Sequence, residues 1–346
     1  MGRFKTVNYW LPHVFKSSGG IYVLLKQAKI LQENGYIVRL FYQPKKHEKM
    51  DVYYKIKLDW VNFDISALNI IPVHHENIIF TDGTVHKANR LEIGINDVFL
   101  IPEGFPNIMK MLKDNPCRKI AYAQGASYIW RTLNVGESWC DYGVKEAITT
   151  SLEIEKHINL TMPSIKTYNY YFSINRKLFY PLEDMSQKTK TIVYLINRGQ
   201  PQEMAANSII KIFKLAYPQH NNWKFERLQG LSREEFAKHV RQATFALHLD
   251  DYVGLPIFPL EAMASHTHLV GWPGIGGDEH VVEGGGHWSP QHSLLPTAEM
   301  LNTAIQDYDA GKLNDRGVIY EKALEKFTEK QERASIIDIF QKLMKS

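Results

Sequence analysis

The sequence predicts an α/β protein built from two doubly wound domains, and three observations carry this prediction. The chain has 346 residues, which is long for a single hydrophobic core. Short apolar runs typical of buried strands alternate with segments of helical spacing. An extended aromatic stretch at 168–181 separates two such series, which places a first domain at 1–170 and a second at 180–330. The terminal helix 331–346 is a candidate to pack back on the first domain.

The beginning of the chain is interpreted as a strand–glycine loop–helix–strand unit. Its parts are a strand at 6–11, the glycine pair Gly19-Gly20, a helix at 21–34 that ends at Gly35, and a strand at 36–42. Such a unit implies a parallel sheet with a ligand near the carboxyl end of the first strand.

The rest of the first domain is less regular. Residues 43–75 are basic and aromatic, and they indicate a loop with one or two short strands. Three later runs are apolar enough for buried strands, at 97–102, 119–124 and 147–151.

A second series of strands and helices fills the remainder of the chain. Strands are expected at 191–196, 223–228, 244–249 and 267–272. Helices are expected at 206–216, 233–243, in the segment around Glu261, at 300–308, at 315–327 and at 331–344. The alternation predicts a second parallel sheet.

The composition is that of an ordinary globular protein, with 44% hydrophobic and 23% charged residues. Two cysteines give no disulfide framework, and the start of the chain lacks the apolar stretch of a signal peptide. No run approaches the roughly 20 apolar residues of a transmembrane helix. A cytoplasmic protein without a transmembrane segment is therefore expected.

The run from Gly254 to Ala264 carries the strongest chemical signal. Gly254 permits a close backbone approach, and the prolines that follow stiffen the entry to a helix. The start of that helix offers unpaired N–H groups that suit a phosphate. Glu261 adds a carboxylate that can accept two hydrogen bonds from neighbouring hydroxyls, such as those of a ribose.

Several motifs together resemble the GT-B glycosyltransferases, and within them the retaining, glycogen-synthase-like branch that uses nucleotide sugars. The matching pieces are, in order, Gly19-Gly20, the strand 97–103, Asn197-Arg198-Gly199, Gly254-Leu255-Pro256, Leu260-Glu261-Ala262-Met263-Ala264, and Gly276-Gly277-Asp278-Glu279. The resemblance implies two Rossmann-like, doubly wound domains that face each other across a cleft.

The same resemblance implies a role for each matched residue. Arg198 would face the donor diphosphate, and its planar guanidinium suits that contact. Glu261 would hold the ribose hydroxyls. The remaining donor-binding positions would be the backbones of Gly19, Gly20, Gly254, Leu255, Gly276 and Gly277.

The catalytic candidates are Arg198, Asp251 and His13. The family has a first Glu upstream of the one that Glu261 matches. Counting back from Glu261 puts Val253 in its place, whereas anchoring on Gly254 puts Asp251 there. Asp251 is preferred because a carboxylate at the end of a strand can reach the donor sugar. His13, beside the first glycine loop, is a candidate to touch the acceptor or the transferred sugar.

The expected activity is transfer of a sugar from a nucleotide diphosphate sugar to an acceptor hydroxyl, with retention and without a metal or other cofactor. The expected acceptor is a glycan or a lipid-linked saccharide. The basic, aromatic stretch at 45–60 leaves a modified base in DNA as a less favoured acceptor. A nucleotide-sugar epimerase and a non-catalytic nucleotide-sugar-binding subunit remain as alternatives from other functional classes.

Overall fold

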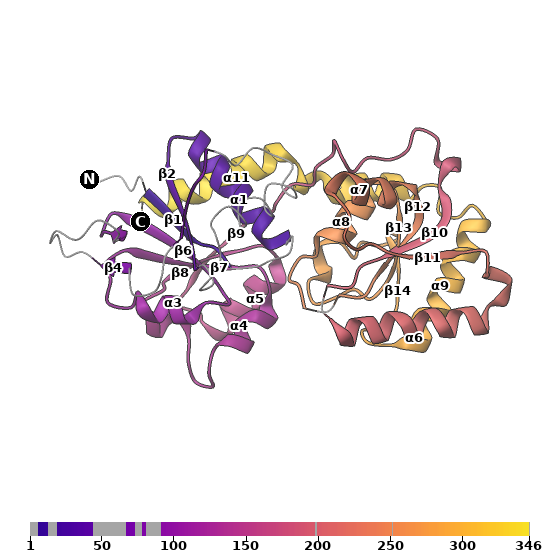
Figure 1. The fold of residues 1–346 in the computed structure, drawn as a ribbon, viewed down its shortest axis with the longest axis horizontal. Coiled ribbons are helices and arrows are strands. Elements are labelled where there is room, and N and C mark those ends of the chain that lie inside the picture. Colours follow the sequence, from indigo (N-terminus) through magenta and orange to yellow (C-terminus); the bar gives the residue numbers. More distant parts are fainter. Residues whose placement is uncertain are drawn as a thin grey trace. The chain divides into compact units, whose positions relative to one another are not determined.

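The computed structural model describes residues 6–12, 19–43, 67–72, 78–80, 91–197, 199–250 and 252–345. The chain divides into two compact units (Figure 1). Unit 1 comprises Met1–Thr150, Ile154–Tyr170 and Glu332–Ser346, and unit 2 comprises Ser151–Glu153 and Tyr171–Gln331. Each unit has its own parallel sheet, and the neighbouring strands of the described sheets all run parallel.

Unit 1 is built on a seven-stranded sheet. Its strands, in spatial order, are β3 (Asn69–Pro72), β2 (Ile37–Tyr42), β1 (Thr6–Trp10), β6 (Asp97–Pro102), β7 (Arg118–Ala123), β8 (Glu146–Thr149) and β9 (Lys166–Asn169). Two short strands, β4 (Ile78–Phe80) and β5 (Leu91–Ile93), pair apart from this sheet. The helices are α1 (Gly19–Glu33), α3 (Pro106–Met111), α4 (Ala126–Thr132), α5 (Leu152–Thr161) and α11 (Glu329–Lys345).

The last helix lies beside the first helix (Figure 1). Lys26 of α1 pairs with the fully buried Glu332 of α11 at 2.7 Å, and the hydroxyl of Tyr170 donates to Glu332 at 2.6 Å. Arg333 and Glu33 add a more exposed pair at 2.7 Å. A buried carboxylate is stable only with such partners, so these contacts fix the first turn of α11 against α1 and Tyr170.

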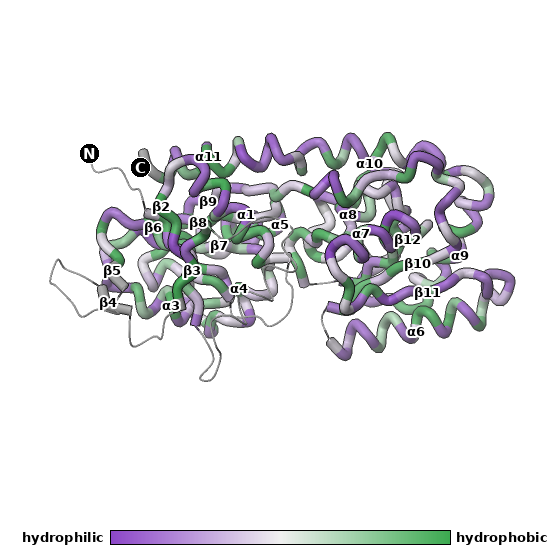
Figure 2. Tube along the Cα trace, turned by 45° about the horizontal axis from the view of Figure 1, so that its top comes forward, coloured by the Kyte–Doolittle hydropathy of each residue, from purple (hydrophilic) through white to green (hydrophobic). Residues whose placement is uncertain are grey.

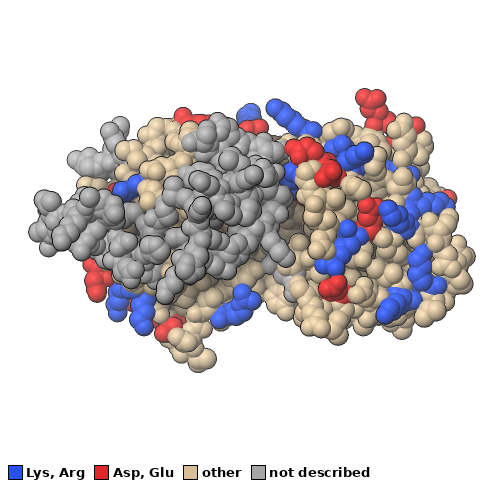
Figure 3. Space-filling model, viewed as in Figure 1, with Lys and Arg blue, Asp and Glu red and all other residues tan. Residues whose placement is uncertain are grey.

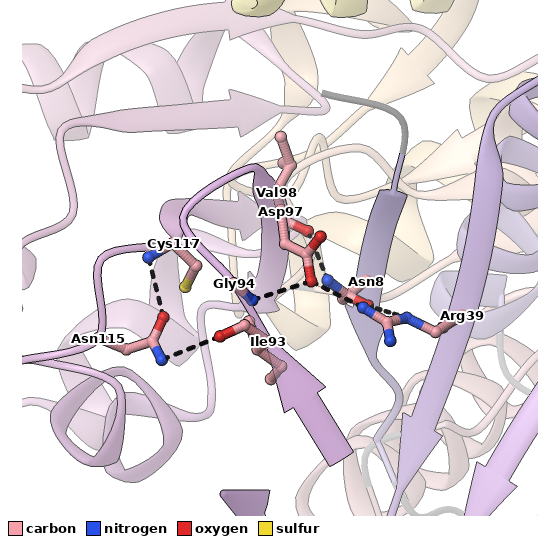
Figure 4. Close-up of polar contacts among 8 residues, drawn as sticks. All are labelled: Asn8, Arg39, Ile93, Gly94, Asp97, Val98, Asn115 and Cys117. Atoms are coloured by element: carbon pink, nitrogen blue, oxygen red, sulfur yellow. Dashed lines mark hydrogen bonds and ion pairs between the residues drawn. The ribbon is translucent and has the colours of Figure 1, made fainter. Parts of the chain in front are cut away.

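A polar network joins β2, β1 and β6 (Figure 4). Arg39 donates from Nε to Asn8 Oδ1 and from its terminal nitrogen to Asp97 Oδ2, both at 2.7 Å. The side chain of Asn8, fully buried, donates in turn to the carbonyl oxygen of Val98 at 3.2 Å. Because all three strands share these bonds, the network fixes their register at the edge where β6 begins.

Unit 2 is built on a five-stranded sheet. Its strands, in spatial order, are β11 (Lys224–Arg227), β10 (Thr189–Tyr194), β12 (Ala243–His248), β13 (His268–Gly271) and β14 (Gly286–Trp288). Its helices are α6 (Gln200–Ala216), α7 (Arg233–Gln242), α8 (Ile257–Ala264), α9 (Leu294–Asp309) and α10 (Arg316–Leu324).

The helices of unit 2 cover both faces of its sheet. Helices α6 and α9 pack on each other on one side, while α7 and α8 lie on the other (Figure 1), where α10 packs against α8. Helix α6 alternates between hydrophobic and hydrophilic residues along its length, as a helix with one face on a sheet does (Figure 2). Helix α8 is buried at every position but its first, because α7, α10, β12 and β13 all pack against it.

The predicted α/β class with parallel sheets is confirmed, and some element boundaries differ from expectation. Helix α6 starts at Gln200 rather than at 206. Residues 166–169 form the edge strand β9, where the start of a linker was expected. Helices α3, α4 and α5, and strand β14, were not anticipated. Among the described residues, no helix has both the length and the apolar character needed to cross a membrane.

Candidate functional site

The sheet of unit 2 changes its winding direction between β10 and β12. The chain leaving β10 passes through α6 to β11 on one side, and it returns through α7 to β12 on the other. Open α/β sheets bind ligands outside the carboxyl ends of the strands at such a point. The candidate donor site is therefore the edge formed by the loops that follow β10 and β12.

Gln202, in the first turn of α6, joins these two loops. Its Oε1 accepts the N–H of Asn197 at 2.7 Å, and its Nε2 donates to the carbonyl oxygen of Leu249 at 3.3 Å. The side chain is buried, so these bonds hold in a low-dielectric environment. Gln202 thus fixes the backbone on both sides of the switch point, next to the predicted donor residue Arg198.

Glycines bring the loops after β12 and β13 into direct backbone contact. A Cβ atom on Gly276 would lie 1.2 Å from the carbonyl oxygen of Gly254. A Cβ atom on Gly274, whose φ is +73°, would lie 2.9 Å from the carbonyl oxygen of Asp250. No other residue type fits these two positions. The glycines of this motif therefore allow the two loops to pack directly against each other.

Helix α8 begins directly after Pro256, which is its N-cap. Its third residue is Pro259, which has no N–H, so the first turn offers the N–H groups of Ile257 and Phe258. These donors and the positive end of the helix dipole lie at the carboxyl edge of the sheet, where a diphosphate would be stabilised.

Glu261 lies in the second turn of α8 and is almost completely buried, at 2% exposure. Its Oε1 accepts a hydrogen bond from the guanidinium of Arg233, the first residue of α7, in a buried ion pair. Burial raises the pKa of the Glu261 carboxyl, and the charge of Arg233 opposes that rise. The carboxylate expected to hold the ribose is therefore already held by a cation from a neighbouring helix.

The corresponding edge of unit 1 lies between β1 and β6, where its sheet changes winding direction. Glu103 follows β6 directly, and one of its oxygens accepts the N–H groups of Gln124 and Gly125 at 3.0 and 2.9 Å. Gln124 in turn donates from Nε2 to the carbonyl oxygen of Gly20 at 3.1 Å. Glu103 thereby positions, through Gln124, the first turn of α1, in which the predicted glycine pair lies.

The environment of Glu103 alters its acidity. Burial raises the pKa of this carboxyl to about 7, although the two backbone N–H groups work in the opposite direction. A carboxyl of this kind exchanges its proton near neutral pH. The sequence placed Glu103 at the end of a strand that resembles the family pattern. Its partners, Gln124 and Gly125, lie 21 and 22 positions later in the chain, so the sequence did not reveal them.

The structure places the predicted donor-binding residues at two edges. Gly254, Leu255, Glu261, Gly276 and Gly277 lie at the carboxyl edge of the sheet in unit 2, and Gly19 and Gly20 lie at the start of α1 in unit 1. The three catalytic candidates, His13, Arg198 and Asp251, lie outside the described residues. The ligand contacts of all these residues stay a prediction.

Three residues at these edges were not assigned a role from the sequence, namely Arg233, Gln202 and Glu103. The start of α7 was visible, because Ser232 and Glu235 form a capping box in which each side chain bonds the other residue's backbone N–H. That signal locates Arg233 on a helix, but it does not reveal a partner 28 positions away.

Comparisons with known proteins bear on this geometry. No family model matches the chain. An alpha-1,6-glucosyltransferase from Actinobacillus pleuropneumoniae serotype 7 (strain AP76) is 24% identical over 245 residues, which cover 65% of this chain and 68% of the relative.

Solved structures match over nearly the whole chain. Sucrose-phosphate synthase from Thermosynechococcus elongatus aligns with a TM-score of 0.66 and 12% identity, over 98% of this chain and 99% of that one. The pneumococcal O-GlcNAc transferase GtfA, in complex with UDP and GlcNAc, aligns with a TM-score of 0.68 and 11% identity over the full length of both chains.

The expectation of a GT-B glycosyltransferase is confirmed at the level of the fold, and the curated relative supports the same class of enzyme. The basic stretch at 45–60, on which the expectation of a DNA acceptor rests, lies outside the described residues, so that expectation stays a prediction. Figure 3 shows basic and acidic side chains interspersed over the visible face of unit 2.

Proposed function

We propose that this protein is a GT-B glycosyltransferase that moves a sugar from a nucleotide diphosphate sugar to a hydroxyl of a glycan or of a lipid-linked saccharide, with retention and without a metal or other cofactor. Since the curated relative is named a glucosyltransferase, glucose is the first donor sugar to test. The observation that carries the proposal is the buried carboxylate of Glu261 on α8, beside the loop of Gly254 at the switch point of its sheet.

The first and second turns of α8 would hold different parts of the donor. The N–H groups of Ile257 and Phe258, at the positive end of α8, suit the diphosphate, whereas the carboxylate of Glu261 suits the ribose hydroxyls. Arg198, which follows the loop held by Gln202, would add a full positive charge beside the diphosphate. These contacts stabilise the leaving group, which is the main electrostatic demand of the reaction.

The transfer itself needs no protein nucleophile. The acceptor oxygen forms a bond to the anomeric carbon on the face that the diphosphate leaves, the bond from that carbon to the diphosphate oxygen breaks, and the acceptor proton passes to the departing phosphate. Asp251 would orient the sugar hydroxyls, and His13 would contact the acceptor or the sugar. The protein contributes positioning and a preorganised positive potential.

The two cysteines, Cys117 and Cys140, are both free thiols. Free thiols fit a reducing compartment, and we propose that the protein acts in the cytoplasm.

The test is a panel of nucleotide sugars, each incubated with saccharide and lipid-linked saccharide acceptors and followed by nucleotide release. The expected result is turnover of one donor, an unchanged rate in excess EDTA, and a product whose anomeric configuration equals that of the donor by NMR. A product of inverted anomeric configuration would overturn the proposal of retention, and loss of activity in EDTA would overturn the proposal that no metal is needed.

Other outcomes of the same panel distinguish the alternatives. Tight binding of a donor without turnover points to a non-catalytic subunit, conversion of the donor to its epimer points to an isomerase, and transfer only to DNA changes the acceptor class. The variant Glu261→Gln is expected to weaken nucleotide binding at least tenfold, since a buried hydrogen bond to a charged group is lost. Glu234→Gln, an exposed position on α7, is the matched control and should bind as the wild type does.

A further inference from the structure

Arg233 occupies an unusual environment for a charged residue. Its side chain is 8% exposed, and its guanidinium carbon lies 4.8 Å from the ring centroid of Phe179 and 5.6 Å from that of Phe236. The capping box between Ser232 and Glu235 fixes the first turn of α7 and therefore the position from which the side chain extends. Two aromatic rings and a helix start thus hold the guanidinium against Glu261.

This arrangement determines the state of the Glu261 carboxyl. An arginine keeps its charge at any pH that a protein tolerates, so Arg233 provides a permanent counter-charge. Without it, burial alone would favour the neutral acid, whose protonated oxygen is a poor acceptor for a hydroxyl donor. The guanidinium also fixes the direction of the carboxylate, because one oxygen is bound to it.

We propose that Arg233 is a positioning residue that presents an ionised Glu261 to the ribose, and that the pair makes the enzyme select ribonucleotide donors over their 2′-deoxyribose counterparts. The inference rests on the proposed role of Glu261. A site built to bind a hydroxyl disfavours the analogue that lacks it, since the carboxylate is then left without its hydrogen bond. The pair thus defines the donors as ribonucleoside diphosphate sugars.

The chain provides a matched control on the same helix. Arg241 of α7 also stacks on an aromatic ring, with its guanidinium carbon 4.4 Å from the ring centroid of Tyr180, and it donates to the carbonyl oxygen of Leu178. Its removal costs a comparable stacked cation and a hydrogen bond, yet Arg241 lies in the last turn of α7, at the end of the helix opposite Arg233. Arg241→Met therefore reports the structural part of the effect.

The experiment is calorimetric titration of the full-length protein with UDP-glucose and with 2′-deoxy-UDP-glucose. The wild type and Arg241→Met should prefer the ribose form by roughly tenfold or more. Arg233→Met should bring the two affinities to within about twofold at pH 7, with part of the preference returning at pH 9 as the carboxyl ionises. Arg233→Lys, which keeps the charge, should retain an intermediate preference.

The outcomes separate this inference from the proposed function. If Arg233→Met keeps the wild-type preference for the ribose form, the inference is overturned and the proposed function stands. If Arg233→Met does not fold, a wild-type preference in Arg233→Lys overturns the inference instead. Wild-type binding of both nucleotides with equal affinity overturns the ribose role of Glu261 itself. In the double variant with Glu261→Gln, Arg233→Met should lower the preference no further.

Discussion

Gly276 lies so close to Gly254 that a Cβ atom on it would come within 1.2 Å of the Gly254 carbonyl oxygen. The contact joins the loop before α8 to the loop before the short helix Gly277–Glu279. Both glycines belong to motifs that the sequence relates to donor binding. The structure adds a packing reason for them, since two backbones meet where no side chain fits.

The first prediction follows from this contact. Gly276→Ala must separate the two loops, because backbone atoms cannot yield as a flexible side chain can, and it should destabilise the protein by about 3 kcal/mol or more. Thermal unfolding measures the loss. Gly277→Ala is the matched comparison: its Cβ atom would meet Val281 at 3.3 Å and Pro273 at 3.4 Å, so its cost should stay near 1 kcal/mol. Equal effects of the two variants would contradict the packing argument.

The second prediction concerns the pH dependence that Glu103 confers. Its pKa is about 7 in the folded protein and 4.5 ordinarily, so the folded state binds this proton more tightly than the unfolded chain. Stability from this group is complete below pH 4.5 and is lost as the pH rises through 7, by up to about 3 kcal/mol. Glu103→Gln keeps an acceptor oxygen for the N–H groups of Gln124 and Gly125 but cannot ionise.

The variant should therefore resemble the wild type at pH 5 and exceed its stability at pH 8. Urea unfolding at both pH values measures the difference. A Glu103→Gln protein whose stability relative to wild type does not change with pH would show that the carboxyl titrates normally.

The third prediction concerns the attachment of α11. Glu332 is fully buried and is bound by Lys26 and Tyr170, so Glu332→Ala leaves both partners without their acceptor and should cost about 3 kcal/mol. Its neighbour Arg333 pairs with Glu33 at the surface, where both side chains are well exposed. Arg333→Ala should therefore cost less than about 1 kcal/mol in the same urea unfolding experiment. A larger effect of the surface variant would refute the assignment of Glu332 as the anchor of this helix.

Local patterns of the sequence were enough for most strands of the two sheets, though not for the edge strands β9 and β14, and for most of the second series of helices. Apolar runs reveal buried strands wherever they occur, and the Gly254–Ala264 segment carries its own helix start and its single carboxylate. The sequence did not predict the short helices α3 and α4, because six or seven residues are too few to show a helical period of apolar residues.

The partners of the site residues could not be read in this way. Arg233 and Glu261 lie on different helices, and Glu103 meets Gln124 across two neighbouring strands. Such pairs form only when the sheet brings distant segments together, so no local pattern encodes them. The sequence thus indicated which side chains carry chemistry, whereas the fold decided which cation or donor each one meets.

The last prediction rests on three buried histidines of unit 2. Burial lowers the pKa of His248, His268 and His280 to about 3, so each stays neutral in the folded protein while it binds a proton below about pH 6.5 in the unfolded chain. Unfolding then takes up protons as the pH falls from 6.5 towards 3, and stability falls by up to about 1.4 kcal/mol per pH unit for each histidine.

The measurement is the melting temperature between pH 5 and pH 6.5, where burial also lowers the pKa values of His266 and His287 and adds to the same loss. Glu103 works in the opposite direction in this range, because its folded form holds a proton that the unfolded chain has released. The wild type should therefore lose stability as the pH falls, and Glu103→Gln should steepen that loss by about one proton, or up to about 1.4 kcal/mol per pH unit. His268→Phe, at a position that packs on Phe245 and Tyr308, should remove one proton from the slope. A slope that neither variant changes would show that these groups have ordinary pKa values in the folded protein.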